Sequence, residues 1–350
     1  MKFKLFVCVV LAVACVLPMA SCKSGGKTSS VTLNVYNWGE YIDESVNKEF
    51  TKQTGINVNY KTYATNEELY AKLKSGGVDY DVIIPSDYMV SRLSSENMLY
   101  KLNFSNIPNF KDIGKNYLNL KYDAKNEYSV PYMWGTVGIV YNKTMVSDPV
   151  DSWDILWNSK YKGKILMFDN SRDAIGIALK KLGYSYNTTD QAQIKKAAAE
   201  LINQKPLVQA YVMDQIFDKM EGGEAALAPY YAGDAVTMMQ DNADLAFAVP
   251  KEGTNLFVDA MCVPKTSGHK TEAEKYINFL CSPDISVKNC EETGYSTPST
   301  AALKKLPAEI RSNTIAYPAE AILKKAEVYT NLPQNILDLY DSQWLDVISK

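Results

Sequence analysis

Residues 31–84, VTLNVYNWGEYIDESVNKEFTKQTGINVNYKTYATNEELYAKLKSGGVDYDVII, decide the fold class of this chain. Apolar residues stand at positions 31, 33 and 35, alternating as they do in a half-buried strand, and YDVII at the end is typical of a buried one. The pattern predicts three strands alternating with two helices: strands at 31–38, 56–63 and 80–84, helices at 43–53 and 67–74. Crossovers of about a dozen residues favour parallel strands, so we predict a doubly wound α/β sheet.

The same alternation returns later in the chain as a second unit. Residues 128–141 (YSVPYMWGTVGIVY) form a long extended run interrupted by Gly135 and Gly138. Strand and helix patterns then alternate over residues 151–250: helices at 151–158, after Arg172, at 190–203 and from Gly233, and strands at 164–168 and ending at Tyr231. Another strand covers 257–264, and helices fill most of the chain from Thr271 on. The pattern predicts two α/β units but leaves open how often the chain crosses between them.

The N-terminus resembles a bacterial lipoprotein signal. Two lysines precede the apolar residues 5–17, and Met19-Ala20-Ser21 leads directly into Cys22. An uncleaved membrane helix is the alternative, but the apolar run is short for a bilayer. We expect residues 1–21 to be a signal peptide, Cys22 to be the acylated first residue, and residues 22–30 to be a flexible tether. The resemblance departs from the usual lipobox at Met19, where Leu is preferred. It implies an extracytoplasmic lipoprotein anchored to the cell membrane, on its periplasmic face or its outer surface.

The size and net charge of the chain limit the kinds of partner that it can bind. About 330 residues follow the expected signal, enough for two modest domains. The signal holds two of the 37 basic residues and none of the 40 acidic ones, so the remainder has a net charge of −5. A mildly acidic chain without a basic cluster disfavours nucleic acid or an anionic membrane surface as a partner.

Cysteine and histidine usage disfavours enzymatic and metal chemistry. Cys262, Cys281 and Cys290 lie in apolar periodic stretches, and we expect them to be buried and unpaired, with a Cys281–Cys290 disulfide as the alternative. The single histidine, His269, lies in a polar run, so a Ser-His-Asp or Cys-His site has little to be built from. Zinc-site spacings of Cys and His do not occur. We therefore expect a protein that is not an enzyme and has no cofactor or resident metal.

Aromatic residues and carboxylates gather where strands end. Ligands of open α/β sheets bind at the carboxyl ends of the strands, and there the chain carries rings at Trp38, Tyr41, Tyr88, Tyr231, Phe257 and Tyr295, and acids at Asp87, Asp173, Asp234 and Asp259. Rings attract a cation by about 0.5–2 kcal/mol each, and carboxylates add charge-assisted hydrogen bonds. Asp259 stands out because a charge inside an apolar strand is costly without a partner. The set predicts a cleft for an organic cation.

The chain contains six longer motifs: NWGEY at 37–41, VPYMWGTVGIVYN at 130–142, PVDSWDILW at 149–157, PKEG at 250–253, NFL and SPD within 278–284, and ETGYSTPS at 292–299. With these motifs the chain resembles the polyamine-binding proteins of bacterial ABC importers, the spermidine- and putrescine-binding members of the extracellular solute-binding proteins. The resemblance implies the type II periplasmic binding protein fold, with two doubly wound lobes joined by crossover strands and closing by a hinge. Lobe 1 is expected over residues 31–139 and 260–315, and lobe 2 over 140–257 and 316–350.

The resemblance also implies which residues bind the ligand. Carried over position by position and joined to the acids above, the expected ligand-binding set is Trp38, Tyr41, Ser86, Asp87, Tyr88, Asp173, Tyr231, Asp234, Phe257, Asp259, Tyr295 and Gln334. Asn170 and Asp173 depart from the spermidine-type pattern, which has an acidic pair around the arginine. Asp234 and Phe257 instead match putrescine-type members. The preference between the two amines stays open.

The expected function is that of a monomeric, lipid-anchored receptor that captures spermidine, putrescine or both and delivers them to an ABC permease. A ferric-ion receptor of the same broad fold is the alternative, because Tyr230 and Tyr231 are similar to the adjacent tyrosines that hold iron there. A secreted glycosidase would also use carboxylates in an aromatic cleft, but the sequence offers no pair of acids suited to flank one bond. A structural surface protein would not need such a cleft.

Overall fold

The computed structural model describes residues 31–350, which form one compact unit. The predicted signal peptide, the acylation site Cys22 and the tether lie outside the described residues. Within the described part, no helix is both long and apolar enough to cross a bilayer.

The strands form a mixed sheet in the order β2-β1-β3-β9-β4-β7-β5-β6, with β8 paired to β4. Their bounds are β1 Thr32–Trp38, β2 Asn57–Tyr63, β3 Val82–Ile83, β4 Ser129–Asn142, β5 Ile165–Phe168, β6 Val208–Val212, β7 Leu227–Tyr231, β8 Leu245–Ala248 and β9 Leu256–Cys262. The first three strands pair in parallel around β1, as the opening residues predict, and β5 pairs in parallel with β6 and β7. Two antiparallel strands, β4 and β9, lie between these parallel groups.

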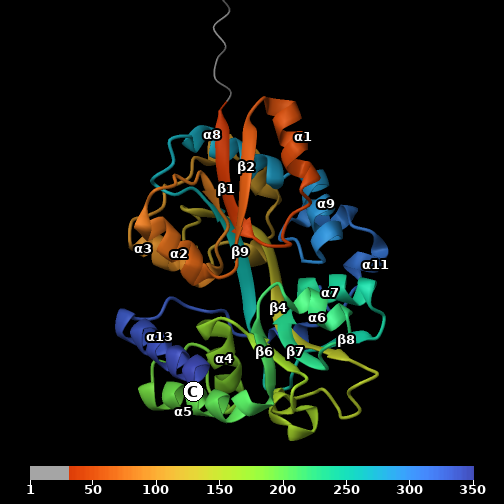
Figure 1. Ribbon diagram of the computed structural model, residues 1–350. Coiled ribbons are helices and arrows are strands. Elements are labelled where there is room, and N and C mark those ends of the chain that lie inside the picture. The colour runs from red at the N-terminus through yellow and green to blue at the C-terminus, as the bar shows by residue number, and fades with distance from the viewer. Residues whose placement is uncertain (1–30) are drawn as a thin grey trace, which may run out of the picture. The chain divides into compact units, whose positions relative to one another are not determined.

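Strand β4 connects the two halves of the sheet. Its first part, residues 129–136, pairs with β9, and its second part, from Val137 on, pairs with β7 and β8. Figure 1 shows β4 and β9 running side by side through the middle of the molecule, with β1 and β2 above and β6 and β7 below. We call the parts above and below this passage the upper and lower halves. The residue numbers expected for the lobe boundaries stay predictions.

Helices flank both halves (Figure 1). The α-helices are α1 Ser45–Thr54, α2 Asn66–Ser75, α3 Asp87–Ser95, α4 Ser171–Lys181, α5 Gln191–Gln204, α6 Ile216–Glu221, α7 Ala232–Asp241, α8 Lys270–Leu280, α9 Pro283–Thr293, α10 Thr300–Lys305, α11 Ala308–Arg311, α12 Glu320–Leu323 and α13 Gln334–Ser349. Short 3₁₀ turns are η1 Phe104–Asn106, η2 Pro108–Asp112, η3 Lys115–Tyr117, η4 Lys121–Asp123, η5 Trp153–Trp157, η6 Ser159–Tyr161 and η7 Lys205–Leu207.

Most expected elements form, with three differences. The helix predicted at 151–158 is only the 3₁₀ turn η5, whose start is capped by the Ser152 hydroxyl. The strand predicted at 80–84 is reduced to Val82–Ile83, because Pro85 follows and the chain turns into α3. Strands β6 and β8 were not predicted; both are half-exposed and lack a clear alternation of buried and exposed residues.

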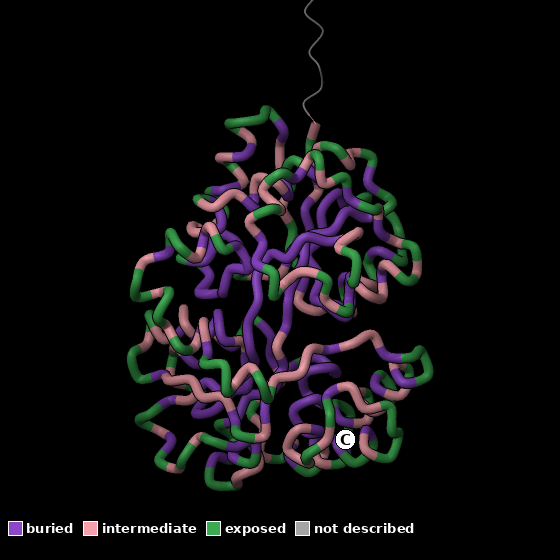
Figure 2. The backbone as a smooth tube through the Cα atoms, turned by 180° about the vertical axis from the view of Figure 1, so that it is seen from behind, coloured by how far each residue is buried: buried purple, intermediate pink, exposed green. Residues whose placement is uncertain are grey.

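Buried residues run continuously along the central strands and into both halves (Figure 2). The two glycines of β4 are explained by aromatic rings that press on the strand. A Cβ at Gly135 would lie 2.8 Å from Cζ of Phe257, and one at Gly138 would lie 2.3 Å from Cζ of Phe247. Cys262, Cys281 and Cys290 are buried and free, which confirms the prediction of unpaired cysteines. The disulfide alternative is wrong.

Candidate functional site

A narrow cavity is lined by residues at the carboxyl ends of β1 and β7, by residues that follow β3 and by residues of β9. The cavity has a volume of about 60 Å³, which is room for on the order of five waters. Ten of the expected ligand residues line it: Trp38, Tyr41, Ser86, Tyr88, Asp173, Tyr231, Asp234, Phe257, Asp259 and Tyr295. Residues more than 200 positions apart in the chain thus line the same cavity, as expected for a ligand site at the ends of the strands of an α/β sheet.

Two expected residues lie elsewhere. Asp87 is fully buried behind the wall, where its carboxylate accepts the backbone N–H groups of Tyr88 at 2.6 Å and Val258 at 3.1 Å. It therefore ties α3 to β9 and does not face the cavity. Gln334 is exposed at the start of α13 and donates to Asp338. The expectation of a ligand contact is corrected for both residues.

The cavity also contains residues that the sequence did not single out. Among them are Glu67 at the start of α2, Arg172 on α4, Asp214 before α6, and Tyr329 before α13. Asp214 and Tyr329 follow no predicted strand. Glu67 and Arg172 each lie four residues after one, as Tyr88 does, and the sequence analysis passed over them. Arg172 stands in the segment MFDNSRDA, and its neighbours in that segment drew attention where it did not.

Within residues 31–350, tyrosine hydroxyls, and no basic side chain, partner the carboxylates that line the cavity. Tyr41 donates to Asp259 at 2.6 Å, and Tyr231 and Tyr329 donate to Asp173 at 2.7 and 3.1 Å. Tyr88 likewise donates to Glu67, at 2.9 Å. Neutral donors satisfy carboxylate oxygens without cancelling their charge, so these acids keep their attraction for a cation.

Asp259 is the least satisfied of these acids. Its side chain is 4% exposed. Oδ2 accepts from Tyr41, while Oδ1 is buried and has no hydrogen-bond partner among residues 31–350. The Ser86 hydroxyl lies near enough to lower the pKa of the carboxyl, but burial dominates and raises that pKa to about 6. An orphaned buried acceptor costs about 1–3 kcal/mol or more when charged, which a bound cation would recover.

Two further cavity acids also have raised pKa values. Burial raises the pKa of Asp234 well above its ordinary value, although a hydrogen bond from Tyr295 acts against the shift. Burial also raises the pKa of Asp173, against the hydrogen bonds from Tyr231, Asn170 and Tyr329. Burial therefore raises the pKa of all three carboxyls, and a cation bound beside them would lower these pKa values again.

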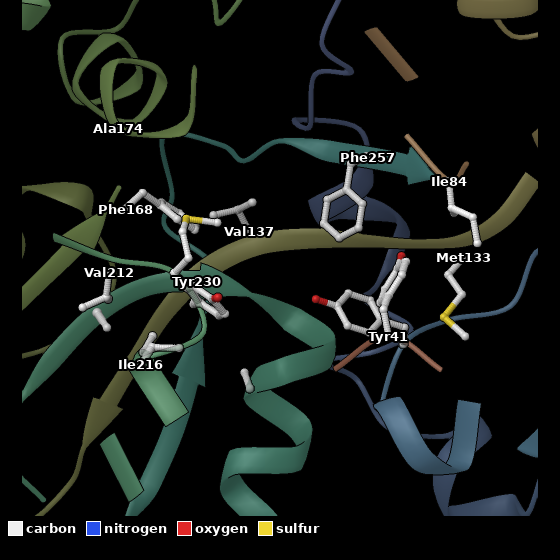
Figure 3. Packing of buried hydrophobic residues seen from close by; sticks show 14 of the residues in the cluster. Tyr41, Ile84, Met133, Val137, Phe168, Ala174, Val212, Ile216, Tyr230 and Phe257 are labelled. Carbon is white, nitrogen blue, oxygen red and sulfur yellow. The ribbon is translucent and has the colours of Figure 1, made fainter. Parts of the chain in front are cut away.

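Aromatic rings form the walls between the acids. The rings of Tyr41 and Tyr295 meet edge to face at 4.7 Å, and those of Tyr231 and Phe257 do so at 5.5 Å. Figure 3 shows Tyr41 and Phe257 beside the ribbon of β4, in the same packed cluster as Phe168 and Tyr230. Such walls suit the methylene groups of an aliphatic cation, and their faces attract its charge.

The geometry does not favour iron. The hydroxyls of Tyr230 and Tyr231 point to different acids, Asp214 at 3.5 Å and Asp173 at 2.7 Å. In the part of the chain that the structure describes, no group of three or more His, Cys, Asp or Glu side chains could hold a metal ion.

Two family models match this chain. The one described as bacterial extracellular solute-binding protein covers residues 80–325. The one described as hypothetical lipoprotein (MG045 family) covers residues 1–126. Among curated proteins, the spermidine/putrescine-binding periplasmic protein of Escherichia coli (strain K12) is 39% identical over 300 residues, which are 85% of this chain and 86% of that protein. The putrescine-binding periplasmic protein SpuD of Pseudomonas aeruginosa (strain UCBPP-PA14) is 30% identical and covers 91% of this chain and 92% of its own length.

A solved structure agrees over nearly the whole described chain. The putative spermidine/putrescine ABC transporter from Listeria monocytogenes is 40% identical, with a TM-score of 0.89, and the match covers 91% of this chain and 99% of that one. The predicted fold, the type II periplasmic binding protein with two α/β halves, is therefore confirmed.

Proposed function

This chain belongs to the bacterial extracellular solute-binding proteins, and on that premise we propose that it is the polyamine receptor of an ABC importer. It binds its ligand in the cavity between the two halves and releases it to a permease. Its relatives are binding proteins of transporters, so it is not an enzyme.

The orphaned Oδ1 of Asp259 is the observation that carries this proposal. A buried, unpaired carboxylate oxygen in a cavity walled by rings needs a donor with positive charge. Asp173 and Asp234 supply further anionic positions along the same cavity. An aliphatic chain carrying several ammonium groups has the matching chemistry, because its charges meet the acids and its methylenes meet the rings.

We further propose the finer features that the sequence indicates. The ligand is putrescine, spermidine or both. The receptor works as a monomer outside the cytoplasmic membrane, held there by acyl chains on Cys22. The lipobox-like residues before Cys22 and the match to a lipoprotein family over residues 1–126 support the anchor.

Thermal unfolding with a series of amines tests the proposed function. We expect putrescine, cadaverine, spermidine or spermine to raise the Tm of the purified protein, because a ligand that binds only the folded state stabilises it by RT ln(1 + [L]/Kd), about 2.7 kcal/mol at one hundred times Kd. An uncharged diol of the same length, 1,4-butanediol, serves as the matched control. A Tm that no amine raises contradicts the proposal.

Amine affinity should fall at acidic pH. The carboxyl of Asp259 has a pKa of about 6 in the empty protein, and an ammonium ligand favours its ionised form. The complex therefore binds fewer protons than the free protein, so affinity rises with pH and levels off above about 6. Calorimetric titration should show about tenfold weaker binding at pH 5 than at pH 7.5. Constant affinity over this range would show that Asp259 is not neutralised by the ligand.

A further inference from the structure

Gly39 and Asp214 lie against one another across the two halves of the sheet. Gly39 directly follows β1 in the upper half, and Asp214 is the second residue after β6 in the lower half. A Cβ at Gly39 would lie 2.2 Å from Oδ2 and 3.1 Å from Cγ of Asp214. Gly39 is not among the glycines with positive φ, so backbone conformation does not require a glycine there. The Asp214 carboxylate takes the space that a side chain at position 39 would need.

The Asp214 carboxylate has few partners in the fold. An aspartate just before a helix is commonly its N-cap, but the N-cap of α6 is Gln215 and no side chain caps this helix. Within residues 31–350 the carboxylate accepts one long hydrogen bond, from the Tyr230 hydroxyl at 3.5 Å. Across the same residues it forms no ion pair. The contacts of the folded chain therefore do not explain why an acid stands at this position.

Positive charge is unevenly distributed among the acids of the cavity. Five acids line it: Glu67, Asp173, Asp214, Asp234 and Asp259. Arg172 is the one basic side chain that lines it among residues 31–350. Burial raises the pKa of Glu67 and of Asp173, and the charge of Arg172 acts against this shift at both carboxyls, together with hydrogen bonds. Arg172 thus partly balances the charge of these two acids.

At Asp234, by contrast, negative charges add up. Burial raises the pKa of this carboxyl well above its ordinary value, and the charges of Asp214, Glu40 and Asp259 raise it further. Burial also raises the pKa of Asp214. Asp259 contributes the buried Oδ1 that has no partner within residues 31–350. A cation among these acids would replace mutual repulsion by attraction and supply the missing donor.

The two carboxylates differ in their exposure to solvent. Asp234 is only 8% exposed, whereas Asp214 is exposed, and both line the cavity. Asp214 therefore stands where the cavity meets solvent, and Asp234 lies further inside. This is a suitable place for the ammonium group at one end of a linear amine.

We propose that Asp214 is a further ligand-binding residue that, together with Asp234, binds one terminal ammonium group of the amine at the opening of the cavity. This inference rests on the proposed function. An ammonium group has three N–H donors and can give a charge-assisted hydrogen bond to each carboxylate. Gly39 leaves the room that the Asp214 carboxylate occupies while the two halves are together.

Asp214→Asn tests the charge, because Asn keeps the size of the side chain. By calorimetry, we expect its affinity for putrescine to be at least tenfold lower than that of the unsubstituted protein, or about 1.4 kcal/mol. Asp218→Asn is the matched control: Asp218 is an exposed acid of α6 that does not line the cavity, and its loss should change affinity by less than threefold. An unchanged affinity in Asp214→Asn, or an equal loss in Asp218→Asn, overturns the proposal but leaves the proposed function intact. If the unsubstituted protein binds no amine, the proposed function itself fails.

A double-mutant cycle tests the part of Gly39. Gly39→Ala should lower putrescine affinity about tenfold, because the added Cβ displaces the Asp214 carboxylate. In Asp214→Ala the same change at Gly39 should cost less than threefold, since the carboxylate that the Cβ would meet is gone. Thermal unfolding of the ligand-free variants checks that each is folded. Equal losses in both backgrounds overturn the role of Gly39 in placing Asp214.

Discussion

Replacing Asp259 with Asn is expected to weaken polyamine binding by about a hundredfold, the largest effect of any single side chain in the cavity. Hydrogen bonds to charged groups contribute about 1.5–3 kcal/mol, and losing one partner of a buried ion pair costs about 2–5 kcal/mol. Asn keeps the size of the side chain and can still accept from Tyr41, whose hydroxyl now meets Oδ2 at 2.6 Å. The change therefore removes the charge while preserving the packing, and calorimetric titration with putrescine and spermidine measures it.

Asp87→Asn is the matched control for this experiment. Asp87 is also a buried carboxyl, it stands on the neighbouring element, and burial raises its pKa to about 8. Its oxygens accept backbone N–H groups and do not face the cavity. We expect Asp87→Asn to lower the Tm but to change amine affinity by less than threefold. Equal losses of affinity in both variants would mean that the fold is damaged and that Asp259 has no special role.

The sequence predicts residues that line the cavity well where a short stretch of sequence marks the end of a strand. Trp38, Tyr88 and Tyr231 each lie at the end of a strand or just after it, and the structure places all three in the cavity. Asp259 was identified for a different reason, since a carboxylate in an apolar strand requires a partner. These inferences depend on strand ends and on burial, which short stretches of sequence reveal.

The position of a residue at a strand end does not predict whether its side chain points into the cavity. Asp87 follows β3 after only three residues, yet it is the first residue of α3 and its side chain turns back to the backbone of Tyr88 and Val258. Nothing in the residues PSDY distinguishes an acid that faces a ligand from one that bonds to its own backbone. The expected ligand contact of Gln334 rested on an alignment that runs through residues 330–333, a segment without regular structure.

The grouping of three tyrosine rings around the Arg172 guanidinium, within 5.3 Å of its carbon atom, could not be predicted from the sequence, although Tyr88 itself was. Its rings come from α3, from the segment before α13, and from α13 itself, at positions 88, 329 and 340. Only the chain's crossing between the halves of the sheet brings these three segments together. Tertiary contacts between distant segments leave no periodic trace in the sequence, so a site assembled from them is visible only in the folded protein.

The contact between Gly233 and Tyr295 leads to the second large expected effect. Gly233 is the second residue of α7 in the lower half, and Tyr295 follows α9 in the upper half. A Cβ at Gly233 would lie 2.2 Å from Cδ2 and 2.3 Å from Cγ of the tyrosine ring. The halves can therefore approach this closely only while position 233 lacks a side chain. Because Tyr295 also lines the cavity, the steric conflict reaches the ligand site directly.

Gly233→Ala is expected to lower amine affinity by ten- to hundredfold without unfolding the protein. Overpacking a tight contact costs about 1–3 kcal/mol. We expect this cost to fall on the arrangement in which the two halves hold the ligand, whereas Ala is a better helix former than Gly within α7. Gly268→Ala is the matched control, because a Cβ there would meet no atom within 4 Å. Calorimetry gives the affinity and thermal unfolding of the ligand-free variant gives its stability. A large fall in the Tm of that variant would show that the contact belongs to the fold in every state, and unchanged affinity would show that ligand capture does not require the two halves to meet at this glycine.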